Sequence, residues 1–278
     1  MKIYKTRNGI VIESGHNLYL SKNTNWDLFI NRDSLYSVVQ KELDDLQSDP
    51  AIKGWLEHSI LAPIGQQEVW AAGVTYLRSR DARINESKES GGATFYDKVY
   101  DADRPELFFK STAERVAGNN EHVRVRKDSI WNVPEPELTL MITSTGEIVG
   151  YTIGNDMSSR SIEGENPLYL PQAKVYDGAA SLGPCIYIPE HPIPLDTGIH
   201  IRIIRGSNIM YSESTHISQM KRTHKELVEY LYRECSFSNG CLLMTGTCLV
   251  PPNEFTLQSG DKIAINIDHI GTLINSVA

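Results

Sequence analysis

The sequence has few cysteines and no long apolar run. Its four cysteines, Cys185, Cys235, Cys241 and Cys248, form no CxxC pair. This pattern argues against a disulfide framework and favours reduced, buried thiols. Nowhere do about 18 apolar residues follow one another, and the stretch MKIYKTRNGIVIES lacks the apolar core of a signal peptide. We therefore expect a cytoplasmic protein with no membrane partner.

The sequence also lacks any concentration of positive charge. It contains 27 lysines and arginines against 35 acidic residues, which gives a formal net charge of -8 and a pI of about 5.5. No basic cluster interrupts this acidic balance, so neither nucleic acid nor an acidic membrane surface is an expected partner. An anionic ligand would have to be attracted by local charges at its binding site.

The 278 residues do contain many short, alternating apolar runs of the kind that form strands. The first 60 residues combine several such runs, including DLFI at 27–30, with a helix expected over 34–47. The pattern resets near Pro63, and strand-like runs dominate from there on. These observations predict a β-rich α+β protein with a small N-terminal α+β domain, 1–60, and a larger domain, 61–278.

Three carboxylates mark the most informative stretch. Glu135 and Glu137 precede an apolar run at 138–143, and Asp156 follows a second run at 147–153. The two runs predict an antiparallel hairpin that returns Asp156 to the end where the glutamates lie. Three carboxylates buried together repel one another and favour a hard divalent cation, Mg2+ first and Mn2+ or Ca2+ after it. The alternative is three solvated acids at strand ends.

Longer motifs surround these acids. They are Glu135-Pro136-Glu137, YTIGNDMSSRSIE (151–163) and KVYDGAASLGP (174–184). With them, the chain resembles the fumarylacetoacetate hydrolase family over roughly residues 60–278. Four further segments look most like the branch of that family that dehydrates 2-keto-3-deoxy-D-arabinonate: VWAAGVTY (69–76), YDKVYDADRPELFFK (96–110), ENPLYLPQAK (165–174) and MTGTCLVP (244–251).

The resemblance implies a mixed β-sandwich roll of the fumarylacetoacetate hydrolase type and one Mg2+ on Glu135, Glu137 and Asp156. It also bears on the reaction. Hydrolytic members carry a GxNYxDHxxE segment whose His and Glu activate water, and the aligned positions here are Ser79 and Ala82. We therefore expect a hydro-lyase that converts 2-keto-3-deoxy-D-arabinonate, or a similar 2-keto-3-deoxy sugar acid, to 2,5-dioxopentanoate and water.

This chemistry gives roles to further residues. A 2-keto acid can chelate a hard cation, which makes its C3 proton removable. Glu106 is the candidate base, and Lys174 is the cation that neutralises either the substrate anion or the developing enolate. Thr247 and neighbouring backbone N–H groups are expected to hold the substrate carboxylate. The predicted substrate-binding residues are Tyr76, Arg78, Lys110 and Arg160. Glu106 as a plain surface acid and Arg160 as a structural ion-pair partner remain open alternatives.

The polar segment 77–94 ends in Gly91-Gly92 and allows two interpretations. It is either a solvated excursion or a lid that orders over bound substrate. Its polar composition supports the solvated excursion, and its place directly after the Gly-Val-Thr-Tyr run at 73–76 supports the lid.

Two other functions compete with the dehydratase. A C–C bond hydrolase of a 2,4-dioxo acid fits the same fold, although the missing His–Glu pair opposes it. A non-catalytic sugar-acid-binding protein is the second alternative, and the retained metal ligands and Lys174 speak against it. The expected partners are a small-molecule 2-keto acid and further copies of the chain, in a dimer or a tetramer.

Overall fold

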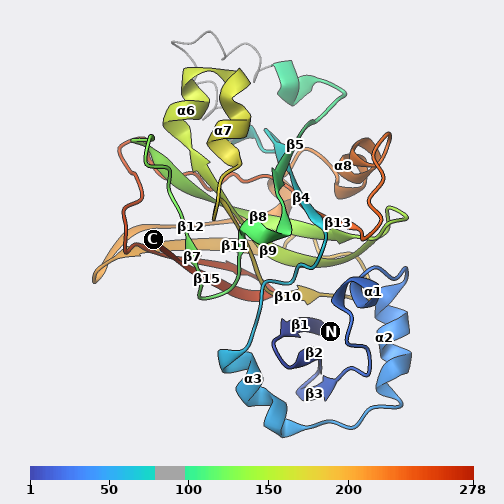
Figure 1. The fold of residues 1–278 in the computed structure, drawn as a ribbon. Helices are drawn as coiled ribbons and strands as arrows, with labels where there is room; N and C mark the ends of the chain where they lie inside the picture. The colour runs from blue at the N-terminus through green and yellow to red at the C-terminus, as the bar shows by residue number, and fades with distance from the viewer. Residues whose placement is uncertain (79–97) are drawn as a thin grey trace.

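The structure is a computed structural model of the chain, and it describes residues 1–78 and 98–278. Ser79, Ala82 and most of the predicted lid segment 77–94 lie outside the described residues. Within the described part, strands dominate from the N-terminal β1–β3 to the C-terminal β13–β15 (Figure 1). The expected β-rich α+β class is confirmed.

A ten-stranded mixed sheet forms the larger layer. Its strands follow the order β3-β2-β1-β10-β9-β8-β13-β4-β5, and β6 pairs with β10. The central hairpin β8–β9 is antiparallel, whereas β13 and β4 are parallel neighbours. The bounds are β1 Lys2–Thr6, β2 Gly9–Ser14, β3 Asn17–Leu20, β4 Glu68–Gly73, β5 Glu106–Ser111, β6 Val116–Ala117, β8 Asn132–Ile142, β9 Ile148–Ser159, β10 Ala180–Tyr187 and β13 Cys241–Met244.

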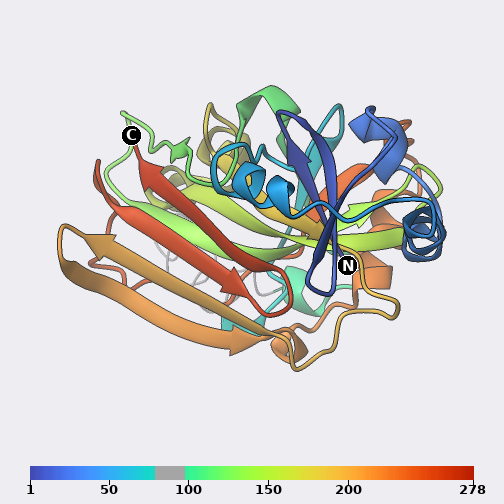
Figure 2. The ribbon, with the colours of Figure 1, turned by 90° about the horizontal axis from the view of Figure 1, so that it is seen from below.

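A five-stranded sheet forms the second layer, which Figure 2 shows stacked against the first. Its order is β12-β11-β14-β15-β7, and all of its pairs are antiparallel except β15 with β7. The bounds are β7 His122–Val123, β11 Gly198–Arg205, β12 Asn208–His216, β14 Lys262–Ile267 and β15 Gly271–Val277.

One hydrophobic core lies between the two sheets. Leu138 and Leu140 of β8 belong to the same buried cluster as Ile201 and Ile203 of β11. Each such side chain contributes roughly 1.5–3 kcal/mol when it is fully buried. Because side chains alternate along a strand, the odd-numbered residues of β8 project from the opposite face of the large sheet.

A second core lies on that opposite face. There Met141 of β8 packs in one cluster with the N-terminal Ile3, Ile12 and Phe29. Strand β1 pairs directly with β10, so the N-terminal strands continue the large sheet without a break. The division into domains 1–60 and 61–278 stays a prediction, since the two regions share one sheet.

Short helices flank the sheets, with α6 and α7 over one end of the β8–β9 hairpin and α1–α3 around β1–β3 (Figure 1). None of the helices in the described ranges is long and apolar enough to span a membrane. The bounds are α1 Trp26–Ile30, α2 Leu35–Leu43, α3 Lys53–His58, α6 Arg160–Glu165, α7 Leu170–Lys174 and α8 His224–Leu231, with 3-10 turns at Pro50–Ile52, Ala113–Arg115, Pro167–Tyr169 and Ile217–Gln219.

The strand expected at 27–30 is wrong, because this run belongs to helix α1. The Asn25 side chain caps the helix by accepting the Leu28 N–H at 3.0 Å. Trp26, Phe29 and Ile30 are buried on one face at helical spacing. The cap and the i, i+3, i+4 spacing together outweigh the β propensity of the aromatic and β-branched residues.

Helix α8 begins at His224. Thr223 caps this helix, and its hydroxyl accepts the Glu226 N–H at 3.1 Å. The Nε2 atom of His224 is buried without a hydrogen-bond partner among the described residues. Burial lowers the pKa of His224 to about 4.

This pKa predicts a stability change with pH. Since the folded pKa lies below the ordinary value of about 6.5, the unfolded state takes up the proton first. The contribution of neutral His224 is therefore complete above pH 6.5 and decreases as the pH falls toward 4. When the pH is lowered from 7 to 5, the free energy of unfolding should fall in wild type by about 1–2 kcal/mol more than in His224→Gln. Urea unfolding at both pH values measures this difference.

The exposed His216 at the end of β12 provides the control. His216→Gln should keep the pH dependence of the wild type. Identical pH dependence in His224→Gln and wild type would show that His224 does not titrate as a buried group.

Candidate active site

Three buried carboxylates gather where the β8–β9 hairpin ends. Glu135 lies directly opposite Asp156 in the antiparallel register, and Glu137 lies opposite Gly154. The three acids are at most 3% exposed, and one oxygen of each lies within 4.8 Å of the others. A Cβ on Gly154 would lie 2.4 Å from the Thr139 hydroxyl, so only glycine allows this close packing. The convergence expected from the hairpin is present.

The prolines of this stretch show why the sheet opens here. Strand β9 pairs with β8 over its whole length, whereas β13 pairs with it only along Thr139–Ile142. Pro134 and Pro136 therefore lie where β8 has no β13 neighbour that requires an N–H donor. The carboxylates project from the face opposite the smaller sheet, beside this opening.

Lys174, the last residue of α7, connects two of the carboxylates. Its Nζ lies 2.5 Å from Glu135 Oε2 and 2.9 Å from Asp156 Oδ2. It also donates to the Ser158 hydroxyl at 2.6 Å. All these groups are buried, so the ion pairs act with little screening by solvent.

Two more cations lie behind the same carboxylates. Lys110 Nζ is 2.6 Å from Asp156 Oδ1 and donates to the carbonyls of Met157 and Lys174 at 3.0 and 2.5 Å. Arg160 Nη2 is 2.5 Å from Glu135 Oε1. These side chains thus orient two of the candidate metal ligands. The contact of Arg160 with Glu135 is the structural ion pair that the sequence left open for this residue. Substrate binding by either residue stays a prediction.

Glu137 differs from the other two acids. Its Oε2 accepts the Gly246 N–H at 2.6 Å, and no lysine or arginine of the described ranges lies within ion-pair distance of it. Burial, then the negative charges of Asp156 and Glu135, raise the pKa of Glu137 well above its usual value. A divalent cation between the three acids would relieve this repulsion. The all-oxygen donor set fits a hard ion such as Mg2+.

A small cavity opens onto the carboxylates. Strands β4 and β13, which are parallel neighbours, end at its edge, and the chain turns there with positive φ at Val74 (52°) and Gly246 (92°). The residues that line it are Ala72, Gly73, Val74, Phe108, Glu135, Glu137, Asp156, Lys174, Gly246 and Thr247. The lining therefore combines three carboxylates and one ammonium group with Thr247, glycine backbone and apolar side chains.

The predicted catalytic residues Glu106, Lys174 and Thr247 come together around this cavity. Lys174 and Thr247 line it, and the Thr247 hydroxyl accepts the Leu249 N–H at 3.1 Å. Glu106 begins β5 opposite Gly73, and its Oε2 lies 2.1 Å from the position that a Cβ on Gly73 would occupy. The absence of a side chain at Gly73 thus leaves room for the Glu106 carboxyl at the cavity edge.

The predicted substrate residues Tyr76 and Arg78 lie differently. Tyr76 is 1% exposed, and burial, with Cys248 and Glu137 nearby, raises the pKa of its hydroxyl above the usual value. Arg78 is exposed and lies beside Tyr211. Burial raises the pKa of Tyr211 to about 12, and the positive charge of Arg78 opposes this rise. Neither residue lines the cavity, so their substrate contacts stay predictions.

Comparison with known proteins agrees with this geometry. A family model described as "Fumarylacetoacetate (FAA) hydrolase C-terminal" matches residues 82–278. The chain belongs to the fumarylacetoacetate hydrolase family. This match confirms the resemblance found in the sequence motifs, and the two-sheet architecture is the one expected from it.

Similar members of the family include two dehydratases. The chain is 47% identical to a probable 2-keto-3-deoxyxylonate dehydratase from Haloferax volcanii, over 83% of this chain and 78% of the relative. It is 42% identical to a 2-dehydro-3-deoxy-D-arabinonate dehydratase from Saccharolobus solfataricus, over 78% and 74%. A solved 2-keto-3-deoxy-D-arabinonate dehydratase, complexed with magnesium and 2,5-dioxopentanoate, has a TM-score of 0.84 and 33% identity, and the match covers 100% of this chain and 98% of that one.

Sequence reasoning missed three contributors to the site. Ser158 and Phe108 could have been found from strand alternation, since Ser158 follows Asp156 by two residues and Phe108 lies midway between Glu106 and Lys110. The Gly246 N–H gave no sequence signal, because backbone amides are positioned only by the fold.

The Gly246 turn provides a test of how Glu137 is held. A Cβ at this position would meet the Thr75 hydroxyl at 2.1 Å, in addition to the unfavourable positive φ. We expect Gly246→Ala to lower the free energy of unfolding by roughly 2–4 kcal/mol, measured by urea unfolding.

Gly206→Ala is the matched control, because Gly206 has φ 60° and nothing within 4 Å of the added Cβ. It should cost only the backbone strain, roughly 1 kcal/mol. Equal losses in the two variants would mean that the Thr75 contact does not constrain the Gly246 turn.

Proposed function

We propose that this chain is a magnesium-dependent dehydratase that removes water from a 2-keto-3-deoxy sugar acid. The observation that carries the proposal is the buried triad Glu135, Glu137 and Asp156 at the wall of a cavity, where Lys174 bridges Glu135 and Asp156. The two dehydratases similar over most of the chain, and the solved dehydratase complexed with magnesium and 2,5-dioxopentanoate, support it. The substrate proposed here is 2-keto-3-deoxy-D-arabinonate, with 2,5-dioxopentanoate as the product.

The residues present fit a magnesium ion. Glu135, Glu137 and Asp156 would hold it, and the raised pKa of Glu137 reflects a repulsion that a cation relieves. When bound, the ion supplies Lewis-acid polarisation of the substrate's keto group, which acidifies the neighbouring C3.

The chain's own residues then perform the elimination. Glu106, at the cavity edge, accepts a proton from C3, and that C–H electron pair first forms an enolate with the keto group. The enolate then returns the electron pair to form the C3–C4 double bond as the C4–O bond breaks. The same proton, returned by Glu106, leaves with the C4 hydroxyl as water. Lys174 stabilises the negative charge that develops on the keto oxygen, and Thr247 binds the substrate carboxylate. The 3,4-alkene that remains loses a proton from C5 and gains one at C3, which gives an enol across C4 and C5. This enol gains a proton at C4 and loses its hydroxyl proton, which gives the C5 aldehyde of the dioxo acid.

The setting of this reaction is also part of the proposal. We propose a cytoplasmic enzyme that assembles from several identical chains, as expected from the sequence. The absence of the hydrolytic His–Glu pair at positions 79 and 82 favours dehydration over C–C hydrolysis in the same cavity.

Product analysis tests the reaction. With Mg2+ and 2-keto-3-deoxy-D-arabinonate, we expect an aldehyde product that semicarbazide traps, and we expect EDTA to abolish its formation. Excess Mg2+ should restore it. Rapid cleavage of an acylpyruvate to pyruvate instead, with no aldehyde from the sugar acid, would mean that the chain is a hydrolase.

Metal binding tests the triad separately from activity. Glu137→Gln should weaken Mg2+ binding by roughly tenfold or more in calorimetric titration, since it removes a direct ligand. Without metal, the variant should melt no earlier than wild type, because the substitution also removes a repelling charge.

Glu254→Gln is the control, since Glu254 is exposed and far along the chain from the triad. Its Mg2+ affinity should equal that of wild type. Unchanged Mg2+ affinity in Glu137→Gln would exclude Glu137 as a ligand.

A further inference from the structure

Strand β5 lies at one end of the ten-stranded sheet, yet a side chain ties it to the centre of that sheet. In the strand order, β8, β13 and β4 separate β5 from β9. Four strand spacings amount to roughly 19 Å, which is more than a lysine side chain can span. The Lys110 ammonium of β5 nevertheless lies 2.6 Å from Asp156 of β9, so the sheet curls back on itself between the two strands.

Lys110 is built into this closure. Besides its contact with Asp156, its Nζ donates to the Met157 carbonyl of β9 at 3.0 Å and to the Lys174 carbonyl of α7 at 2.5 Å. The β4–β5 register shifts by one residue here, since Phe109 and Ser111 oppose consecutive residues of β4. Such a bulge redirects the side chain of the extra residue. Lys110 is 0% exposed and does not line the cavity, so its contacts are structural.

The contacts of Lys110 complete a ring of neighbouring strands. Backbone ladders join β9 to β8, β8 to β13, β13 to β4 and β4 to β5, and Lys110 joins β5 back to β9. The cavity is lined from β4, β5, β8 and β9, from the turns that follow β4 and β13, and from α7. The ring therefore encloses the cavity, and its closure at Lys110 sets how far apart the sides of the cavity lie.

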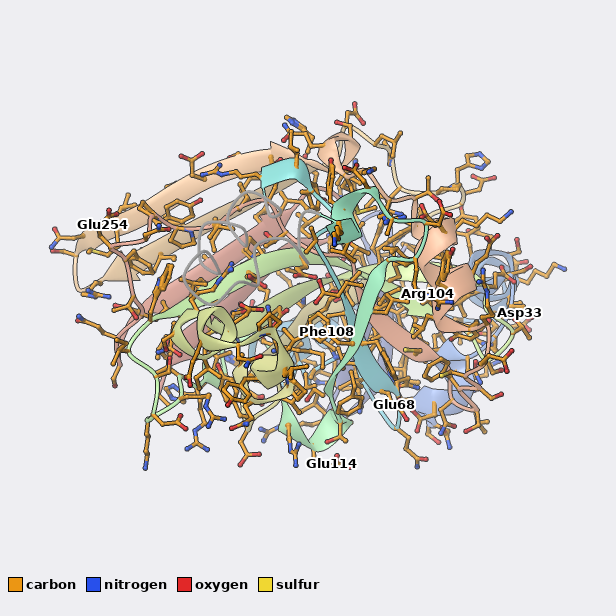
Figure 3. All side chains as sticks on the ribbon, turned by 90° about the horizontal axis from the view of Figure 1, so that it is seen from above. Asp33, Glu68, Arg104, Phe108, Glu114 and Glu254 are labelled. Atoms are coloured by element: carbon orange, nitrogen blue, oxygen red, sulfur yellow. The ribbon has the colours of Figure 1, made fainter. Side chains whose placement is uncertain are left out.

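The proposed base belongs to the strand that Lys110 closes. Glu106 begins β5 and lies four residues before Lys110, roughly 13 Å along the strand. Figure 3 labels Phe108, which lies midway between the two. Within the described residues, β5 pairs only with β4. An opening of the ring at Lys110 would therefore let β5 pivot on β4 and move Glu106 relative to the three carboxylates.

We infer that Lys110 is a positioning residue that closes the ring and thereby holds Glu106 at a fixed distance from the metal-binding carboxylates. The inference rests on the proposed function, in which Glu106 takes the C3 proton of a substrate held at those carboxylates. It gives Lys110 a role that needs no contact with the substrate, in place of the substrate contact expected from the sequence.

Proton exchange on pyruvate isolates the step that this geometry controls. Pyruvate has the carboxylate and keto groups of the substrate but no C4 hydroxyl, so it can lose a C3 proton to Glu106 without eliminating water. In D2O with Mg2+ present, the enolate takes back a deuteron at C3, and the decrease of the methyl proton signal in NMR gives the exchange rate. Calorimetric titrations with Mg2+ and with pyruvate measure binding separately.

We expect Lys110→Met to slow this exchange roughly 100-fold, the loss typical of a misplacement of about 1 Å. The variant keeps the length of the side chain but removes its charge and its donors. Mg2+ and pyruvate should bind at most about threefold more weakly than to wild type, because the position of the base matters only in the transition state. Asp156 also keeps its contact with Lys174 and loses a neighbouring charge that repels the ion. In dehydration, kcat should fall with little change in KM.

Lys110→Gln is the second variant, and it decides the question if Lys110→Met does not fold. Its amide can still donate to one carbonyl but carries no charge for Asp156. We expect it to slow exchange roughly tenfold, with the same preserved binding.

Phe109→Leu is the matched control on the same strand. Phe109 contacts Trp70 of β4 edge-to-face, with ring centroids 6.0 Å apart. The substitution removes packing from β5 but leaves the contacts of Lys110. It should lower the melting temperature and keep the exchange rate within about twofold of wild type.

Three results would overturn the inference. The exchange rate could stay unchanged in a folded Lys110 variant, or it could fall equally in Phe109→Leu. Mg2+ affinity could also fall roughly tenfold together with exchange, which would place the effect of Lys110 at the metal ligand Asp156. In each case, dehydration of the sugar acid by wild type leaves the proposed function intact. If wild type neither exchanges the pyruvate protons nor dehydrates the sugar acid, the proposed function fails and the inference fails with it.

Discussion

The position of Lys174 between Glu135 and Asp156 is the interaction on which the site depends. The carboxylates of Glu135 and Asp156 lie opposite each other on paired, buried strands and would repel each other. The ammonium group of Lys174 contacts both of them. Removing one partner of such a buried pair typically costs about 3–5 kcal/mol, because the remaining charge has no water to solvate it. Lys110 and Arg160 contact the outer oxygens, so two of the three acids have fixed orientations before any ligand arrives.

Glu137, the third acid, has no such ion pair with a lysine or arginine of the described residues, and this difference favours the binding of a cation. Glu137 is held by one backbone N–H of the Gly246 turn and is repelled by its two neighbours. The free energy stored in this repulsion becomes available to a cation that binds all three acids. A site with full internal charge balance would be more stable when empty and would bind a metal more weakly.

The geometry of the large sheet explains why the cavity lies where it does. The β13 partner of β8 stops at Met244, and the prolines at 134 and 136 lie in the stretch that pairs with β9 alone. Chain turns at Val74 and Gly246 then place backbone and small side chains across from the acids. The other face of the same strands packs on the five-stranded sheet.

The sequence by itself determined the strand-rich class, the hairpin and the three convergent acids, because alternation and turn residues are local properties of the chain. It misassigned residues 27–30, where a local cap outweighed β propensity. Only the tertiary structure decided that Lys110 and Arg160 contact the metal-ligand candidates, that Gly246 donates to Glu137 and that Phe108 faces the cavity. Those contacts join residues 25 to 109 positions apart, and their geometry depends on packing that no local pattern encodes.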